Sequence, residues 1–147
     1  MYGDATAIRR LAGRMRERAD EIRAGAAQLA DHTDHVAWHG LAADAMRRHT
    51  HRRIAALLET ARLHDDAADA LDRHAAEVQR LQDLIATIEH RVAGLVGAAR
   101  DRIADLGRGL LDRVTDAAPD PRDLLLSDFC PPPPGDAAWL RVDLPGL

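Results

Sequence analysis

The chain has 147 residues, of which 46% are hydrophobic, 30% are charged and only 3% are aromatic. This length is sufficient for one domain, but so few aromatic side chains do not supply a thick globular core. The formal net charge is -4, and acidic and basic residues are interleaved along the chain, which argues against the clustered basic surface that nucleic acids require.

The sequence predicts neither a signal peptide nor a membrane span. Five arginines between Arg9 and Arg18 are not followed by the apolar run of a secretory signal. No stretch approaches the roughly 20 apolar residues of a transmembrane helix. The single cysteine, Cys130, cannot form an internal disulfide, which leaves only an intermolecular one open. If the protein leaves the cytoplasm, we expect a route without an N-terminal signal.

The first predicted element is an amphipathic helix over residues 4–35, with Asp4 as its N-cap. Large apolar residues recur every seven positions, and small ones recur at the same interval three positions earlier. This is a two-position heptad seam, in which the small row allows two helix backbones to approach closely. The large row is Ile8, Met15, Ile22, Leu29 and Val36, and the small row is Ala5, Ala12, Ala19, Ala26 and Thr33.

A turn is predicted at Trp38-His39-Gly40, between two long amphipathic stretches. Glycine tolerates the backbone angles of a tight turn, and a tryptophan ring beside it can plug the end of the interhelical seam. His32 and His35 precede His39 at a spacing that zinc could use. Because His39 lies in the turn and no second element holds the geometry, we predict no metal site.

A second and longer helix is predicted over residues 41–118, ended by the prolines that follow. Leu57 and Leu71 belong to its seam, and His64 is a polar position in the same row. Folding back about the turn, the first helix covers the second only to about Leu71. The apolar stripe from Ala75 to Val114 is therefore expected to lack a partner within the hairpin.

Two arrangements would cover this stripe. The chain could turn again at Gly94 to Gly97, so that residues 98–118 fold back as a third helix, or a second polypeptide could cover a straight helix. The uninterrupted phase through Val92, Leu95 and Ala99 favours the straight helix.

Residues 119–147 are a proline-rich tail. Pro131 to Pro134 predict an extended, stiff rod of the kind that often serves in recognition. A disordered tail and a segment that docks on this protein or on a partner are both open. Phe129 and Trp139, in a chain so poor in aromatic residues, favour docking.

Residues 4–95 resemble the WXG family of small helical hairpins of bacterial type VII secretion, in length, in helix count and in the placement of Trp38 and Gly40 at the turn. The resemblance implies an all-α antiparallel hairpin that pairs with another WXG-type hairpin, as a homodimer or heterodimer, into a four-helix bundle of the coiled-coil type. It also implies export in the folded state by the type VII secretion ATPase.

The family carries an export pattern on its second helix, formed by a hydrophobic residue, an acidic residue four positions later, and hydrophobic residues three and seven positions further on. Ile85, Glu89, Val92 and Val96 fit this pattern and share one helix face. We expect Glu89 to be solvent-accessible beside an apolar strip. A common variant begins with Tyr where this chain has Ile85, so the resemblance leaves open whether this chain or its partner carries the signal.

No set of nucleophile, base and orienting residue can be assembled, so we predict no catalytic site, no cofactor and no enzyme activity. The predicted function is that of a type VII secretion substrate, or of its dimer partner, acting through helix-helix association. Such a protein is cytoplasmic before export and then secreted or bound at the cell surface. The alternative is a structural coiled-coil adaptor with no secretion role, in which Trp38 only plugs the core.

Overall fold

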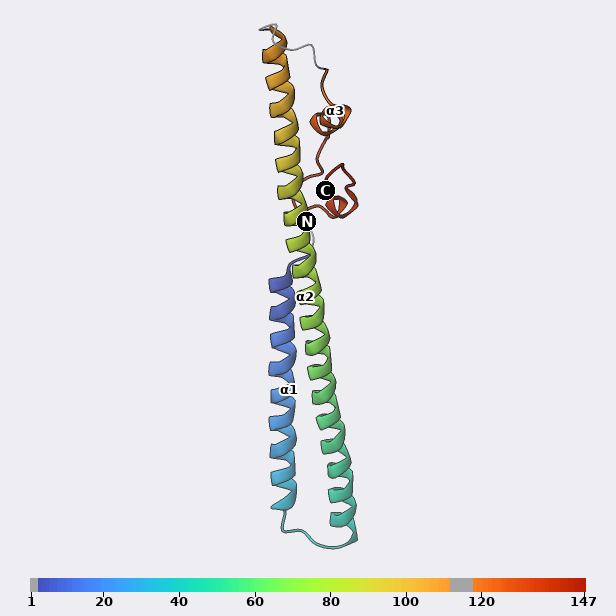
Figure 1. The fold of residues 1–147 in the computed structure, drawn as a ribbon. Coiled ribbons are helices and arrows are strands. Elements are labelled where there is room, and N and C mark those ends of the chain that lie inside the picture. The colour runs from blue at the N-terminus through green and yellow to red at the C-terminus, as the bar shows by residue number, and fades with distance from the viewer. Residues whose placement is uncertain (1–2, 112–117) are drawn as a thin grey trace. The chain divides into compact units, whose positions relative to one another are not determined.

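The computed structural model describes residues 3–111 and 118–147, and every regular element in these residues is a helix (Figure 1). The elements are α1 (Ala5–Asp34), α2 (Leu41–Leu111), α3 (Pro121–Ser127) and the 3-10 helix η1 (Ala137–Arg141). The predicted all-α class is confirmed. Two compact units are formed, Asp4–Glu77 and Val78–Leu147, the latter joined by Gly3, and α2 contributes residues to both.

Helix α2 is unbroken from Leu41 to Leu111. It continues through Gly94 and Gly97 because glycine in a helix interior costs only about 1 kcal/mol relative to alanine and retains both backbone hydrogen-bonding groups. The prediction that this helix does not break at Gly94 to Gly97 is confirmed up to Leu111, and the alternative of a third helix after Gly97 is wrong. Residues 112–117 of the predicted helix lie outside the described residues.

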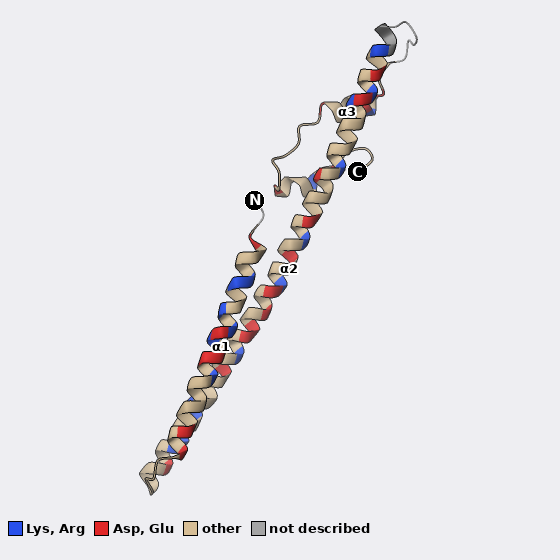
Figure 2. Ribbon diagram, turned by 90° about the vertical axis from the view of Figure 1, so that its left-hand side faces the viewer, with Lys and Arg blue, Asp and Glu red and all other residues tan. Residues whose placement is uncertain are grey.

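The unit Asp4–Glu77 is an antiparallel hairpin in which α1 packs beside the first part of α2 (Figure 1). Asp4 caps α1 as predicted, since its Oδ1 accepts hydrogen bonds from the N–H groups of Thr6 (2.9 Å) and Ala7 (3.0 Å). Acidic and basic positions are interleaved along both helices (Figure 2).

Alanine forms the interior of the hairpin. Ala12, Ala19 and Ala26 of α1 are at most 1% exposed, whereas the large row three positions later is only half-buried. Side chains that end at Cβ allow the backbones to approach closely, so larger ones have no room between them and lie to the side. The predicted seam therefore exists with its small row at the centre. On α2 the matching residues, each 0% exposed, are Ala61, Ala68 and Ala75.

Interhelical ion pairs set the register of the hairpin. Arg16 donates to Asp72 (2.7 Å) and Asp69 (2.8 Å), and Arg23 pairs with Asp65. Seven residues forward along α1 thus correspond to seven residues back along α2, which brings Ala19 to the level of Ala68. Exposed pairs of this kind contribute at most about 1 kcal/mol each, so they select the register while alanine packing holds the helices together.

The unit that contains Val78–Leu147 is built on the second part of α2, onto which the C-terminal segment, residues 118–147, folds back (Figure 1). Ile85 and Val92 are each 2% exposed, and they share one apolar cluster with Leu126, Trp139 and Leu144. The tail therefore docks on the protein itself.

The expectation that the stripe beyond Ala75 lacks an intramolecular cover is consequently wrong for the part from Ile85 to Ala99. The physical reason is that an apolar stripe needs only apolar atoms against it, and these need not come from a helix. A short helix, a proline-rich stretch and a 3-10 turn supply them here. Within the described ranges, no helix is long and apolar enough to cross a membrane.

Two glycines in the hairpin should respond oppositely to alanine. Gly25 lies within α1, and a Cβ there meets no atom within 4 Å, so Gly25→Ala should raise the free energy of unfolding by about 1 kcal/mol. Gly40 has φ +109°, which alanine rarely adopts, so Gly40→Ala should lower it by about 1 kcal/mol. Urea denaturation followed by circular dichroism measures both, and stabilisation by Gly40→Ala would contradict the turn geometry.

Candidate interaction surfaces

The hairpin has two unlike faces. On both helices the large apolar residues follow the alanine row by three positions, and the charged residues Arg23, Asp65 and Asp72 follow it by four. Because the helices are antiparallel, equal offsets from facing alanines fall on the same side of the pair. One side therefore carries the ion pairs. The other side, called the apolar face here, carries Ile8, Met15, Ile22, Leu29, Leu57, His64 and Leu71, all of them half-buried.

His64 interrupts the apolar face at the level of Ile22 in the register set by the ion pairs. Its Nδ1 lies 2.9 Å from the backbone oxygen of Thr60, on the same helix. The predicted seam residues Ile8, Met15, Ile22, Leu29, Leu57 and Leu71 are thus brought together on one face. None of them is sealed inside the hairpin.

The hairpin tip does not contain a plug. Trp38 is 51% exposed and Leu41 is 89% exposed, so the interpretation of Trp38 as a buried ring closing the seam is wrong. Trp38 lies in the segment between α1 and α2, outside both helices. Arg47 organises the turn instead, since its Nη2 donates to the backbone oxygens of Val36 (3.1 Å) and Trp38 (2.8 Å). Gly40 has the positive φ expected of the turn glycine.

The residues of the export pattern lie together on α2, but they are covered. Ile85 and Val92 are buried in the cluster with Trp139, and Val96 is half-buried against it. The carboxylate of Glu89 is also engaged, because its Oε1 accepts a hydrogen bond from the N–H of Gly135 at 2.6 Å. The expectation of an open apolar strip is therefore wrong for Ile85 and Val92, whereas Glu89 beside them is half-buried. The four residues of the predicted pattern share one face of α2, and the C-terminal segment lies against that face.

Trp139 anchors the C-terminal segment, residues 118–147, which is called the cover here. Its ring is 5% exposed and lies 6.5 Å from that of Phe129, with the two planes tilted by 58°. Its indole N–H donates to the backbone oxygen of Pro133 at 3.0 Å, so burial leaves no unpaired donor on the ring. The proline run thus turns back around the ring that it helps to bury.

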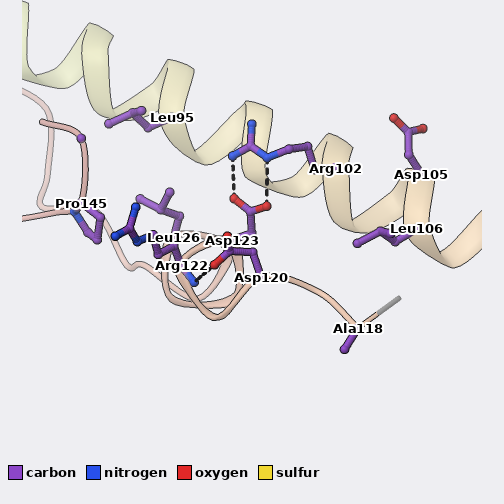
Figure 3. Close-up of a pocket in the computed structure, with 11 residues that line it drawn as sticks. Leu95, Arg102, Asp105, Leu106, Ala118, Asp120, Arg122, Asp123, Leu126 and Pro145 are labelled. Atoms are coloured by element: carbon purple, nitrogen blue, oxygen red, sulfur yellow. Dashed lines mark hydrogen bonds and ion pairs between the residues drawn. The ribbon is translucent and has the colours of Figure 1, made fainter. Parts of the chain in front are cut away.

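A charge pair fastens α3 to α2. Arg102 donates two hydrogen bonds to Asp123, from Nε at 2.9 Å and from Nη2 at 2.5 Å (Figure 3). These bonds lower the pKa of Asp123 below its ordinary value, although burial acts in the opposite direction. The side chain of Asp123 is 11% exposed, whereas that of Arg102 is 54% exposed. The carboxylate is therefore the buried partner and depends on the guanidinium.

Two hollows lie between the C-terminal segment and α2. The first, of about 810 Å³, surrounds the Arg102–Asp123 pair and is bordered by Leu95, Asp105 and Pro145 (Figure 3). The second, of about 460 Å³, lies between Val92 and Val96 of α2 and the rings of Phe129 and Trp139. Both hollows open to solvent, so the side chains that line them are not fully enclosed by the fold.

Sequence reasoning missed the residues that fasten the cover: Arg102, Asp123, Gly135 and Leu144. A partial signal existed in Asp120-Pro121, because an N-cap followed by proline at the first helical position marks a helix start, and in Asp136, because aspartate is a preferred N-cap residue. Asp120 and Asp136 indeed cap α3 and η1. Nothing in the local sequence indicates which part of α2 these short helices contact.

In the described part of the chain, no three His, Cys, Asp or Glu side chains converge as metal ligands would. His35 instead contacts Asp31 of its own helix, with 3.2 Å between Nδ1 and the carboxylate. Cys130 is exposed.

Comparison with protein-family models, with curated proteins and with solved structures finds no match to this chain. The resemblance to the WXG family thus rests on the residues of the chain itself.

Substitution of each tryptophan in turn should show that Trp139 stabilises the protein and that Trp38 at the hairpin tip contributes little to stability. Truncation of a buried aromatic side chain costs about 3–5 kcal/mol, so Trp139→Ala should lower the free energy of unfolding of the covered unit by an amount in that range. Trp38→Ala is the matched control, and because the ring is half exposed its effect should stay within about 0.5 kcal/mol. Urea denaturation followed by circular dichroism measures both. Equal losses would contradict the assignment of Trp139 as the anchor.

The cover should also weaken in acid. Because the docked state lowers the pKa of Asp123, protonation favours the undocked state. The stabilisation is complete above the ordinary aspartate value of about 4 and is lost as the pH falls through the lowered value. In a Trp38→Phe background, Trp139 fluorescence should shift to the red over this acidic range. The same titration of a protein that also carries Asp123→Asn should lack this component, and an unchanged titration would show that the pair does not hold the cover.

Proposed function

We propose that this protein is a non-enzymatic substrate of type VII secretion, or the dimer partner of one, and that it acts by helix-helix association. The observation that carries the proposal is the one-sided apolar face of the hairpin. A face with large apolar residues every seventh position on two helices is the surface from which four-helix bundles are assembled. The turn supports the family resemblance, since Gly40 has the required backbone geometry and Trp38 is presented at the tip.

The occupant that fits the apolar face is a second hairpin of the same kind, either another copy or a related WXG-type chain. The two half-buried rows run in parallel along the pair, so a partner must offer two apolar rows with the same seven-residue spacing. A second antiparallel hairpin offers them. The ion-paired opposite face carries charges of both signs and remains in water in such a bundle.

In this proposal the protein is cytoplasmic before export, is recognised by the secretion ATPase, and is then secreted or held at the cell surface. The second candidate is a structural coiled-coil adaptor without a secretion role. One observation favours it: the C-terminal segment occupies the export pattern, as it would in a protein whose α2 is never read.

Two adjacent leucines provide the test of association. Leu57 lies on the apolar face, whereas Leu58 is 47% exposed on the ion-paired side. Burying a large aliphatic residue contributes about 1.5–3 kcal/mol, so Leu57→Asp should weaken the dimer at least tenfold, and Leu58→Asp should leave it intact. Light scattering coupled to size exclusion measures the mass, and circular dichroism verifies that both variants stay helical. A wild-type chain that is monomeric alone and with every co-encoded hairpin would exclude the proposed association.

Export distinguishes the two candidates. Secretion that requires the type VII ATPase supports the secretion substrate, and a dimer that is retained in cells with an active system supports the adaptor. Because the association face and the export pattern lie on different parts of α2, Leu57→Asp and Glu89→Ala separate dimerisation from recognition.

A further inference from the structure

The most completely buried large side chains of the described chain are those that the export pattern requires. Ile85 and Val92 are each 2% exposed, and they share their apolar cluster with Leu126, Trp139 and Leu144 of the C-terminal segment. The acidic member of the pattern is engaged by the same segment, since Gly135 donates its N–H to Glu89. A receptor that binds these side chains and the C-terminal segment cannot both contact them at the same time.

We propose that the C-terminal segment is a displaceable cover that holds the export pattern closed, and that the secretion ATPase binds α2 by displacing the segment. This inference rests on the proposed secretion function and adds its regulation. The ATPase takes the place of the segment on Ile85, Glu89, Val92 and Val96.

The described interactions that hold the cover on α2 are few and noncovalent. One charge pair, Arg102 with Asp123, holds α3, and one aromatic ring, Trp139, fills the cluster. The bond from the N–H of Gly135 to Glu89 adds to these, as do two longer ones, from Arg91 Nη2 to the backbone oxygen of Gly146 and from Arg100 Nη2 to that of Ser127, both at 3.3 Å. No covalent link holds the segment in the described residues, where Cys130 is free and exposed.

The geometry of the cover also suits exchange more than permanent packing. A hollow of about 460 Å³, open to the surface, is lined by Phe129 and Trp139 of the cover and by Val92 and Val96 of α2. Apolar atoms that line an open hollow make fewer contacts than atoms in a close-packed interior. The hairpin interior, with alanines at 0 to 1% exposure, is the contrasting case in the same chain.

Two aspartates that border the same hollow provide a matched pair of variants. Asp123→Asn removes the buried carboxylate that Arg102 grips, whereas Asp105→Asn removes a carboxylate that only pairs with Arg108 on α2 and is 69% exposed. Both changes alter the net charge equally. In the Trp38→Phe background, fluorescence of Trp139 and its quenching by acrylamide report whether the segment is docked. Asp123→Asn should shift the emission to the red and increase quenching, and Asp105→Asn should not.

Recognition is then measured with the full chain, as secretion in the native bacterium and as binding to the purified secretion ATPase. Apparent affinity scales with the fraction of molecules in the competent state, so a variant that raises the open fraction about tenfold should lower the apparent Kd by the same factor. Asp123→Asn and Trp139→Ala should both raise export and binding above wild type. Adding Glu89→Ala to either variant should abolish the gain.

The outcomes separate the cover from the secretion function itself. Release of the segment is detected by fluorescence for Asp123→Asn and by increased proteolysis for Trp139→Ala. If these variants release the segment but are exported no better than wild type, the proposal of a displaceable cover is overturned. If wild-type export still depends on Glu89 in that case, the proposed function stands. Export only of the released variants supports the cover. If wild type and both released variants are neither exported nor bound, both proposals are overturned. If the segment stays docked in both variants, the proposal of a displaceable cover is overturned.

Discussion

The apolar repeat of α2 is longer than its partner helix, and the rest of the structure follows from this mismatch. Helix α2 has 71 residues and α1 has 30, so a simple hairpin leaves more than half of the repeat in water. Exposing a continuous apolar stripe of that length is unfavourable. The chain therefore brings its own C-terminal segment against the part that α1 does not reach.

The two ways of covering α2 use different rows of the same repeat. Beside α1 the innermost residues of α2 are Ala61, Ala68 and Ala75, whereas beneath the C-terminal segment they are Ile85 and Val92, which continue the row of Val78. A second helix packs most closely against side chains that end at Cβ. An irregular segment cannot follow a helix surface so regularly, and it buries larger side chains around a single large ring, Trp139.

The sequence predicts well what depends on local periodicity. The heptad spacing predicted the hairpin, its small and large rows, and the unbroken course of α2 past Gly94, because these follow from which residues share a helix face. The cap by Asp4 follows from its side chain alone. The cover could not be predicted in the same way, since its pairing with α2 joins residues far apart in the sequence and its prolines, turns and short helices have no period.

The candidate surfaces show the same division. The spacing placed Ile85, Glu89, Val92 and Val96 on one face, and the structure retains that face. Their exposure was mispredicted because it is decided by Trp139 and Gly135, which lie more than forty positions away along the chain. Trp38 was mispredicted as well. The motif indicates a turn, but the burial of the ring beside it depends on what packs at the helix ends, and Trp38 is 51% exposed there.

The energetics of the cover favour exchange over spontaneous opening. Moving Ile85 and Val92 from the cluster into water would cost about 1.5–3 kcal/mol for each side chain, and the carboxylate of Asp123 would lose the charged hydrogen bonds that lower its pKa. A receptor that presents its own apolar surface and a donor for Glu89 removes most of the first cost, because the side chains pass from one apolar environment to another. The apolar side chains that the segment buries in the free chain are then buried against the receptor in the complex. Release of the segment and recognition of α2 are therefore coupled steps.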